Sequence, residues 1–389
     1  SNCCPICHHE DKQPFFEIDQ LPTFIGVQWP SPEAARTCRR GAIRLVYCPG
    51  CGFIWNDRFD AKLLEYGQAY DNSLDFSPVF QKFARALAER LIETYDIRDK
   101  DVVELGCGKG HFLSLICEAG NNRGVGFDPS YQGERITHPA AGRVTYIQDF
   151  YGEKYTHHPG DLICCRHVFE HIDDPVGFLG MVRRTMGDRR EAIVYFEVPN
   201  ARFILERLSV WDIIYEHCNY FSRESLATVF QREGFEVLRV AETYGGQFLG
   251  LEARLAPPAA PAAGRPDLTE LTRAVAGFSE QMQARQAAWQ ARFADYRAKG
   301  KCVVVWGGGA KAVSFLNGLD LAGDEVRCVV DINPHKQGKF VPGTGQPIVA
   351  PESLKELQPE VAVLMNPIYR QEVAAELEKM GLTVELIEA

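Results

Sequence analysis

The chain has 389 residues, of which 46% are hydrophobic and 24% are charged, and its formal net charge at pH 7 is −10. This length exceeds what one hydrophobic core usually supports, and the composition excludes a disordered protein. The acidic balance argues against nucleic acid as a partner, because phosphate-binding surfaces are built from clustered lysine and arginine. We therefore expect several domains that act on a small molecule.

Two pairs of cysteines near the start of the chain have the spacing of a metal site. The pairs are Cys4 with Cys7, in CCPIC, and Cys48 with Cys51, in CPGC. A two-residue gap lets both thiolates of a tight turn face one ion, and four thiolates fit tetrahedral Zn²⁺. The sequence predicts a structural zinc-binding module over residues 1–75, with free thiols as the alternative. Nearby side chains that could replace a ligand are Cys3, His8, His9 and Cys38.

Targeting features favour the cytoplasm. The sequence contains no run of about 18 apolar residues and no secretory leader. Thirteen cysteines without an export signal are more typical of thiols and metal ligands than of disulfides. We expect a cytoplasmic monomer or homodimer without a membrane partner.

Residues 76–255 alternate helical and strand patterns, which predicts a parallel sheet with helices on both faces. A helix beginning after Ser77 precedes the strand DVVEL, the turn GCGKG and the helix HFLSLICEA. Glycines 106, 108 and 110 let a ligand approach the backbone, and the helix start offers N–H groups to it. An NAD site is the alternative, but it would show GxGxxG, a pattern that Lys109 and Gly110 break.

Acidic residues end the next two strands. Asp128 lies 24 residues beyond Glu104, at the end of NRGVGFD, where a carboxylate can accept hydrogen bonds from both ribose hydroxyls. Asp149 and Phe150 end RVTYIQDF and suit the amino group and the ring face of adenine. The pattern therefore indicates a cofactor that contains adenosine.

Four motifs in this order, ELGCGKG, GFDPS, QDF and RHVFEHIDDP, resemble those of the class I S-adenosylmethionine-dependent methyltransferases. The resemblance implies a Rossmann-like α/β domain with S-adenosylmethionine as cofactor. It places the glycine loop under methionine and ribose, and His167 near the methionine end. The residues expected to bind the cofactor are Glu104, Gly106, Cys107, Gly108, Gly110, Asp128, Pro129, Asp149, Phe150 and His167.

The segment YEHCNYFS, after the fifth strand, gathers groups that can move protons. His217 is flanked by Tyr215 and Glu216 and is followed by Tyr220. Methyl transfer to carbon needs a proton to be removed first, and a histidine near its ordinary pKa can remove it. Glu216 would orient His217 or raise its basicity. A packed, structural histidine is the alternative for His217 and for His171, a second catalytic candidate.

A proline- and alanine-rich hinge, APPAAPAAGRPD, opens the linker and long helix expected over residues 256–299. The apolar positions of this helix predict packing between domains, with a coiled-coil dimer as the alternative. Residues 300–389 then repeat the strand, glycine turn and helix pattern in VVVWGGGAKA, and a strand ends at Asp331. This predicts a C-terminal Rossmann-like α/β domain.

Four side chains or turns of the C-terminal domain are candidates for binding the acceptor. Gly309 and Lys311 would receive its phosphates or another polar end, while Asn366 and Tyr369 would line the same cleft. The alternative is a domain that closes the active site without binding a ligand.

The zinc module, YEHCNYFS and the C-terminal motifs together are similar to the sugar C-methyltransferases, which act on nucleotide-linked 4-keto deoxysugars. The resemblance implies that the ketone acidifies a neighbouring carbon, that His217 removes its proton and that the enolate takes the methyl group. Tyr215, or Tyr70 from the N-terminal module, would stabilise the enolate, and Tyr220 would contact the acceptor. Alternatives are an O- or N-methyltransferase of a natural product, an RNA methyltransferase and an NAD-dependent oxidoreductase.

Overall fold

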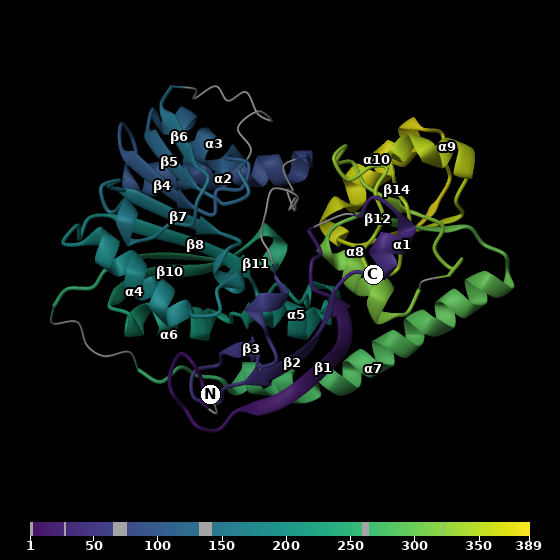
Figure 1. Cartoon of the computed structure of the whole chain (residues 1–389), viewed down its shortest axis with the longest axis horizontal. Helices are drawn as coiled ribbons and strands as arrows, with labels where there is room; N and C mark the ends of the chain where they lie inside the picture. The colour runs from purple at the N-terminus through teal and green to yellow at the C-terminus, as the bar shows by residue number, and fades with distance from the viewer. Residues whose placement is uncertain (1–2, 27–28, 65–75, 132–141, 259–263, 322) are drawn as a thin grey trace.

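The computed structural model describes residues 3–26, 29–64, 76–131, 142–258, 264–321 and 323–389, in which three sheets organise the chain (Figure 1). Tyr70 lies outside the described residues. An antiparallel N-terminal sheet, a central sheet and a parallel C-terminal sheet confirm the expected α/β class. No helix in these ranges has the length and apolar character needed to span a bilayer.

The N-terminal sheet is antiparallel and takes its last strand from the middle of the chain. Its order is β1-β2-β3-β9, and Ile54 of β3 pairs with Tyr220 of β9. Since β9 begins two residues after His217, this sheet fixes the loop that carries the histidine. The elements are β1 (Gln13–Pro22), α1 (Pro32–Arg36), β2 (Arg40–Tyr47), β3 (Ile54–Asn56), η1 (Ala61–Leu63) and β9 (Asn219–Tyr220).

The central sheet has the order β10-β11-β8-β7-β4-β5-β6. The five strands from β8 to β6 are parallel, as predicted, whereas β11 and β10 form an antiparallel hairpin that the sequence patterns did not reveal. Its strands are β4 (Asp101–Leu105), β5 (Arg123–Phe127), β6 (Val144–Ile147), β7 (Leu162–Arg166), β8 (Ile193–Pro199), β10 (Phe235–Thr243) and β11 (Phe248–Leu255). The helices and 3₁₀ turns around it are α2 (Pro78–Tyr95), α3 (His111–Gly120), α4 (Pro175–Met186), α5 (Ala201–Arg207), α6 (Arg223–Arg232), η2 (Glu153–Tyr155), η3 (Phe169–His171), η4 (Val210–Asp212) and η5 (Tyr244–Gly246).

Helices cover both faces of this sheet because successive strand residues point to opposite sides. Val102 packs in a core with residues of α2 and α3, whereas its neighbour Val103 packs in a core with residues of α4 and α6. The predicted cap of α2 is confirmed, since the Ser77 hydroxyl accepts a hydrogen bond from the Phe80 N–H at 3.4 Å. The strand ends that carry the candidate residues are thereby held at one edge of a rigid sheet.

The C-terminal sheet is parallel throughout, with the order β14-β13-β12-β15-β16. It repeats the predicted strand, glycine turn and helix at β12 and α8. Its elements are β12 (Val303–Trp306), α8 (Ala310–Gly318), β13 (Val329–Val330), β14 (Ile348–Val349), η6 (Pro351–Ser353), α9 (Leu354–Leu357), β15 (Val361–Leu364), η7 (Pro367–Tyr369), α10 (Arg370–Lys379) and β16 (Glu385–Glu388).

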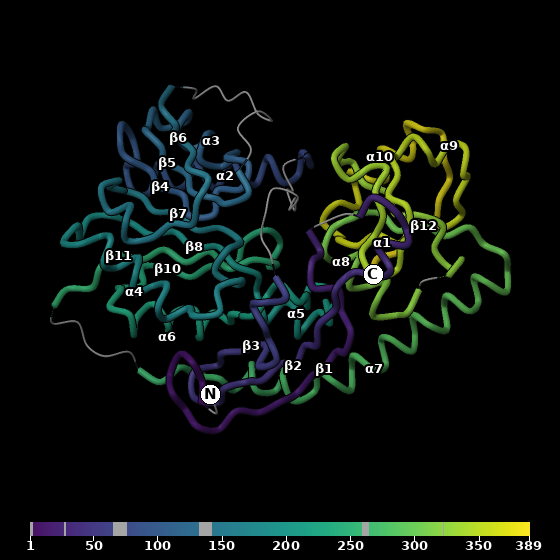
Figure 2. Tube along the Cα trace, viewed as in Figure 1, coloured from purple at the N-terminus to yellow at the C-terminus, as the bar shows by residue number. Residues whose placement is uncertain are grey.

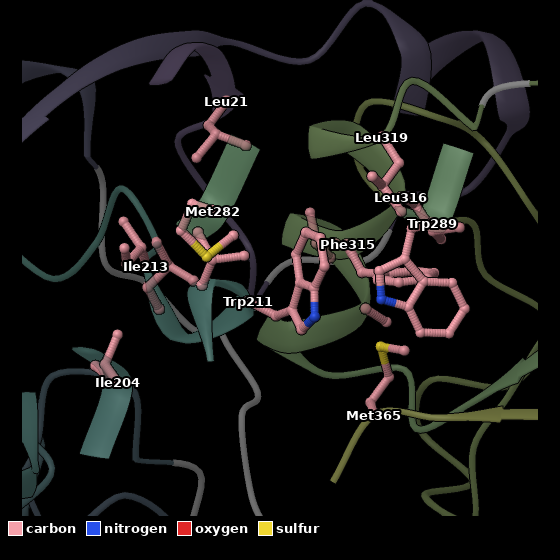
Figure 3. Packing of buried hydrophobic residues seen from close by; sticks show 14 of the residues in the cluster. Leu21, Ile204, Trp211, Ile213, Met282, Trp289, Phe315, Leu316, Leu319 and Met365 are labelled. Atoms are coloured by element: carbon pink, nitrogen blue, oxygen red, sulfur yellow. The ribbon is translucent and has the colours of Figure 1, made fainter. Parts of the chain in front are cut away.

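One long helix, α7 (Thr269–Ala298), runs from the N-terminal sheet to the C-terminal unit (Figures 1 and 2). Its buried side chains share one core with residues of all three parts of the chain. Within this core Trp211 lies beside Phe315, with ring centroids 4.8 Å apart, and Met282 and Trp289 of α7 lie on either side (Figure 3). The apolar stripe that a coiled-coil dimer would need is therefore buried within the chain itself.

Candidate active site

The turn between β4 and α3 has the geometry of a ligand cradle. Gly106, Gly108 and Gly110 have φ values of 68°, 53° and 84°, a region that favours glycine. A Cβ on Gly106 would lie 2.2 Å from Val168, and one on Gly110 would lie 2.3 Å from Tyr146, so both positions are closely packed. A Cβ on Gly108 would meet no described atom within 4 Å. The open space over Gly108 is where a ligand can approach the backbone.

Carboxylates lie around this turn at the ends of the next strands. Asp128 accepts hydrogen bonds from Gly108 N–H at 2.8 Å and from the Ser130 N–H and hydroxyl at 2.7 and 2.6 Å. Asp149 accepts from Lys154 and Tyr155, and these contacts lower the pKa of its carboxyl to about 2.

The Phe150 ring follows Asp149 and is 65% exposed. The remaining cofactor candidates lie within this frame: Glu104 and Cys107 are buried at the turn, and Pro129 follows Asp128. Burial raises the pKa of the Cys107 thiol well above its usual range, so the thiol stays neutral. Open glycine backbone, fixed carboxylates and an exposed aromatic ring suit the adenosine and methionine of S-adenosylmethionine.

His167 stands between two buried carboxylates at the end of β7. Its φ is 55°, and its N–H donates to the Glu197 carbonyl at 2.8 Å. Its ring nitrogens lie 3.7 Å from Glu170 Oε1 and 3.2 Å from Glu197 Oε1. Burial alone would lower the pKa of His167, but Glu170 and Glu197 raise it to about 9. At neutral pH this side chain is therefore an imidazolium.

His217 lies close to Glu170 and His171. Its ring centroid is 4.8 Å from that of His171. A carboxylate oxygen of Glu170 and one ring nitrogen each of His171 and His217 all lie within 4.8 Å of one another. Burial, together with His171, lowers the pKa of His217 to about 3. Its buried Nδ1 has no hydrogen-bond partner within the described part of the chain. His217 is therefore a neutral imidazole with an unused ring nitrogen.

Backbone hydrogen bonds hold this cluster together. The Cys218 N–H donates to the Glu170 carbonyl at 3.0 Å, and His171 Nδ1 lies 2.9 Å from the Glu216 carbonyl. The Asn219 amide donates to the Ile172 carbonyl at 2.6 Å. The loop of His217 is thus fixed on η3. Val168, the residue just before η3, packs on Gly106 and so places η3 beside the glycine turn.

The three neighbours of His217 in sequence make contacts elsewhere. The Tyr215 hydroxyl accepts from the Asp60 N–H at 3.0 Å, and Glu216 Oε1 accepts from the Ile25 N–H at 2.9 Å. The Tyr220 hydroxyl donates to the Ile214 carbonyl at 3.1 Å. The contacts of Tyr215 and Glu216 join the loop to the N-terminal part of the chain and argue against Tyr215 as the group that stabilises an enolate.

Sequence reasoning missed Glu170 and Glu197 as parts of this site. Glu170 stands beside His171 in FEH, and Glu197 lies within the buried strand VYFEVP, so each acid was visible but neither had a local signal. Only the contact of η3 with the loop between η4 and β9 brings Glu170 to His217.

Three acceptor candidates of the C-terminal unit contact the turns η4 and η5 of the central domain. Lys311 Nζ pairs with Asp212 at 2.8 Å, and the Asn366 amide donates to Gln247 at 2.9 Å. The hydroxyl of Tyr369 accepts from the Tyr244 hydroxyl at 2.5 Å. The fourth candidate, Gly309, caps α8, and a Cβ there would meet no described atom within 4 Å. The structure therefore gathers polar groups where the two units face each other.

The four N-terminal cysteines come together as their spacing predicted. Cys4 Sγ lies 3.7 Å from Cys51 Sγ, and Cys7 Sγ lies 3.4 Å from Cys48 Sγ. Four thiolates around one Zn²⁺ would lie roughly 3.8 Å apart, given Zn–S bonds of about 2.3 Å. All four sulfurs are within 4.8 Å of one another, which fits a tetrahedral metal site.

Comparisons with known proteins agree with this geometry. The family described as methyltransferase domain matches residues 78–240, and the family described as C-methyltransferase C-terminal domain matches residues 267–383. C-methyltransferase NovU of Streptomyces niveus is 29% identical over 389 aligned positions, covering 95% of this chain and 90% of its own.

Two further similar proteins cover less than half of the chain. A tRNA U34 carboxymethyltransferase of Aliarcobacter butzleri is 26% identical over 164 positions, which cover 34% of this chain and 51% of that protein. An S-adenosylmethionine-dependent methyltransferase from Mesorhizobium loti has 15% identity and a TM-score of 0.35, covering 44% of this chain and 99% of its own. The two family matches together with the NovU alignment identify the chain as a class I S-adenosylmethionine-dependent methyltransferase with a C-methyltransferase C-terminal domain.

Proposed function

We propose that this enzyme methylates a carbon atom beside a ketone in a small molecule, and that His217 is the base. The observation that carries the proposal is a neutral, half-buried His217 whose Nδ1 is buried without a hydrogen-bond partner among the described residues, on a loop fixed to the segment that borders the glycine turn. A protonated or fully hydrogen-bonded imidazole could not accept a proton.

The residues of the chain divide the work as follows. His217 takes the proton of the acidified carbon, the C–H bond breaks, and its electron pair moves to the carbonyl oxygen as an enolate. S-Adenosylmethionine, when bound, would supply an electrophilic methyl group: the enolate carbon would form a bond to it as the S–CH₃ bond breaks and leaves its electron pair on sulfur. Asp128 would hold the ribose hydroxyls, and Asp149 with Phe150 would hold adenine.

The acceptor that we propose is a nucleotide-linked keto-deoxysugar or a related natural-product intermediate. The similarity to the sugar C-methyltransferases supports this class, and so does the alignment with the C-methyltransferase NovU along 95% of the chain. Lys311, Asn366, Tyr369 and Gly309 would bind its polar end. Lys311 would exchange its pairing with Asp212 for a phosphate of the acceptor.

We also propose that the four-cysteine cluster holds a structural Zn²⁺. Its support is the donor set and the sulfur spacing, because mutually close thiolates need a cation between them. Metal analysis of the purified protein should give one zinc per chain, and Cys48→Ser should lose it.

The experiment that tests the reaction is hydrogen exchange without methyl transfer. With S-adenosylhomocysteine bound in D₂O, the wild-type enzyme should introduce deuterium at the acceptor carbon. His217→Ala should lose this exchange and reduce turnover by at least about 100-fold, with an unchanged Kd for S-adenosylmethionine. Turnover without exchange would overturn carbon methylation and favour an oxygen or nitrogen acceptor.

A further inference from the structure

Glu170 is a buried carboxylate surrounded by imidazole rings. It lies in η3, is 1% exposed, and its Oε1 lies 3.7 Å from Nδ1 of His167. A ring nitrogen of His171 and one of His217 lie within 4.8 Å of a carboxylate oxygen of Glu170. Its Oε2 is buried without a hydrogen-bond partner among the described residues. A buried carboxylate with a free oxygen is costly unless a positive charge stands or forms nearby.

The charges around Glu170 keep it ionised. Burial would raise the pKa of its carboxyl, but the contact with the protonated His167 holds that pKa below its usual range. On the far side, His167 is held as an imidazolium by Glu197, which itself pairs with Arg166 at 2.8 Å. Glu170 is therefore a fixed negative charge that faces the neutral His217.

We propose that Glu170 is a positioning residue that orients His217 and stabilises the imidazolium formed when His217 removes the acceptor proton. The inference rests on the proposed role of His217 as base. A neutral imidazole in a buried site is a poor proton acceptor, because its protonated form loses hydration. The Glu170 carboxylate offsets this cost only at the moment when the charge forms, as expected for electrostatic stabilisation of a transition state.

Glu216, the acid beside His217 in sequence, is placed for a different task. Its Oε1 accepts hydrogen bonds from the N–H groups of Ile25 and Gly26, at 2.9 and 3.4 Å. These contacts anchor the loop to the N-terminal part of the chain. The hydrogen bond from Cys218 N–H to the Glu170 carbonyl instead fixes the distance between Glu170 and the loop of His217.

A double-mutant cycle on the full-length enzyme tests this proposal through deuterium exchange at the acceptor carbon. Glu170→Gln should slow exchange about 10- to 100-fold and leave the KM of the acceptor and the Kd of S-adenosylhomocysteine within about twofold. In the His217→Ala background, where the residual turnover is measured in place of exchange, the same change should cost less than about twofold, because the charge that Glu170 stabilises no longer forms. Glu170→Asp, which keeps the charge, should recover part of the rate.

Glu252→Gln is the matched control, since Glu252 is also 1% exposed but pairs with Arg90 on the other side of the sheet. It should lower stability and leave exchange by the folded enzyme unchanged. Equal losses from Glu170→Gln in both backgrounds, or none in the wild type, would overturn the role of Glu170. Unchanged exchange in His217→Ala would instead overturn the proposed base.

Discussion

The chain builds the same backbone device twice, in the central and in the C-terminal sheet. In the first, Gly108 N–H donates to the carboxylate of Asp128 at 2.8 Å. In the second, Gly308 N–H donates to the carboxylate of Asp331, also at 2.8 Å. In both, a strand ends in a glycine turn that starts a helix, and the acid ends the next strand. Sequence and backbone alone would assign both turns to a nucleotide.

The surroundings of the two acids differ. Asp128 is half-buried, and the space above Gly108 is open. Asp331 is 8% exposed, and Nζ of Lys336, which is itself 4% exposed, lies 3.6 Å from its carboxylate and 3.4 Å from the Gly308 carbonyl. The chain's own ammonium therefore takes the place that ribose hydroxyls would need. A glycine turn with a terminal acid indicates a cofactor site only where that acid remains accessible.

The largest difference between the turns should appear when each acid is removed. Asp128→Ala should weaken S-adenosylmethionine binding on the order of 1,000-fold, because two hydrogen bonds to a charged acceptor are lost. Asp331→Ala should leave the Kd within about twofold. Isothermal titration of both variants measures this, and equal losses would contradict the distinction.

Lys336→Met tests whether the second turn is closed by its own ion pair. Removing the cation leaves Asp331 buried and uncompensated, which should lower the free energy of unfolding by about 3 kcal/mol. Denaturant titration would measure the loss. The double variant Lys336→Met with Asp331→Leu, which removes both charges, should recover stability. A gain of nucleotide binding by Lys336→Met would instead show that the turn is a masked site.

His167 beside the first turn should make stability depend on pH. Its pKa is raised from 6.5 to about 9 in the folded protein, so its contribution is complete below pH 6.5 and is lost as the pH rises through 9. We expect a decline of about 2 kcal/mol between these limits, after allowing for its partial exposure. His167→Gln should abolish this part of the decline, and an unchanged pH profile would contradict the charge assigned to His167.

A methyl group on Gly108 should give the smallest effect. Gly108→Ala places a side chain at positive φ and into the open space, so we expect about 10-fold weaker cofactor binding and about 1 kcal/mol less stability. Gly309→Ala in the second turn should change neither, since its φ is −91°. Thermal unfolding with and without S-adenosylhomocysteine compares the two variants.

Local patterns predicted most of the frame. The Ser77 cap, the glycine turn after β4, the length of α7 and the four-cysteine cluster all follow from spacing within short segments or from paired motifs. These features depend on residues that are near one another in sequence or that share one ligand, so they can be predicted without knowledge of the fold.

Features set by distant pairing escaped prediction. The two-residue strand β9 exists only because it pairs with the distant strand β3, in the register of Tyr220 with Ile54 and of Asn219 with Trp55. Lys336 enters the second turn through a loop, and Glu170 reaches His217 through backbone contacts between η3 and another loop. Sequence periodicity carries no information about contacts between distant segments, so the roles of the charged side chains inside the sites became visible only in the structure.

The most direct test is a crystal structure of the enzyme with S-adenosylhomocysteine. The account predicts one ligand per chain, with its ribose on Asp128 at the first turn and its sulfur facing the side of the site that holds His217. A ligand bound at Asp331, or a His217 ring that points away from the sulfur into packed protein, would contradict it.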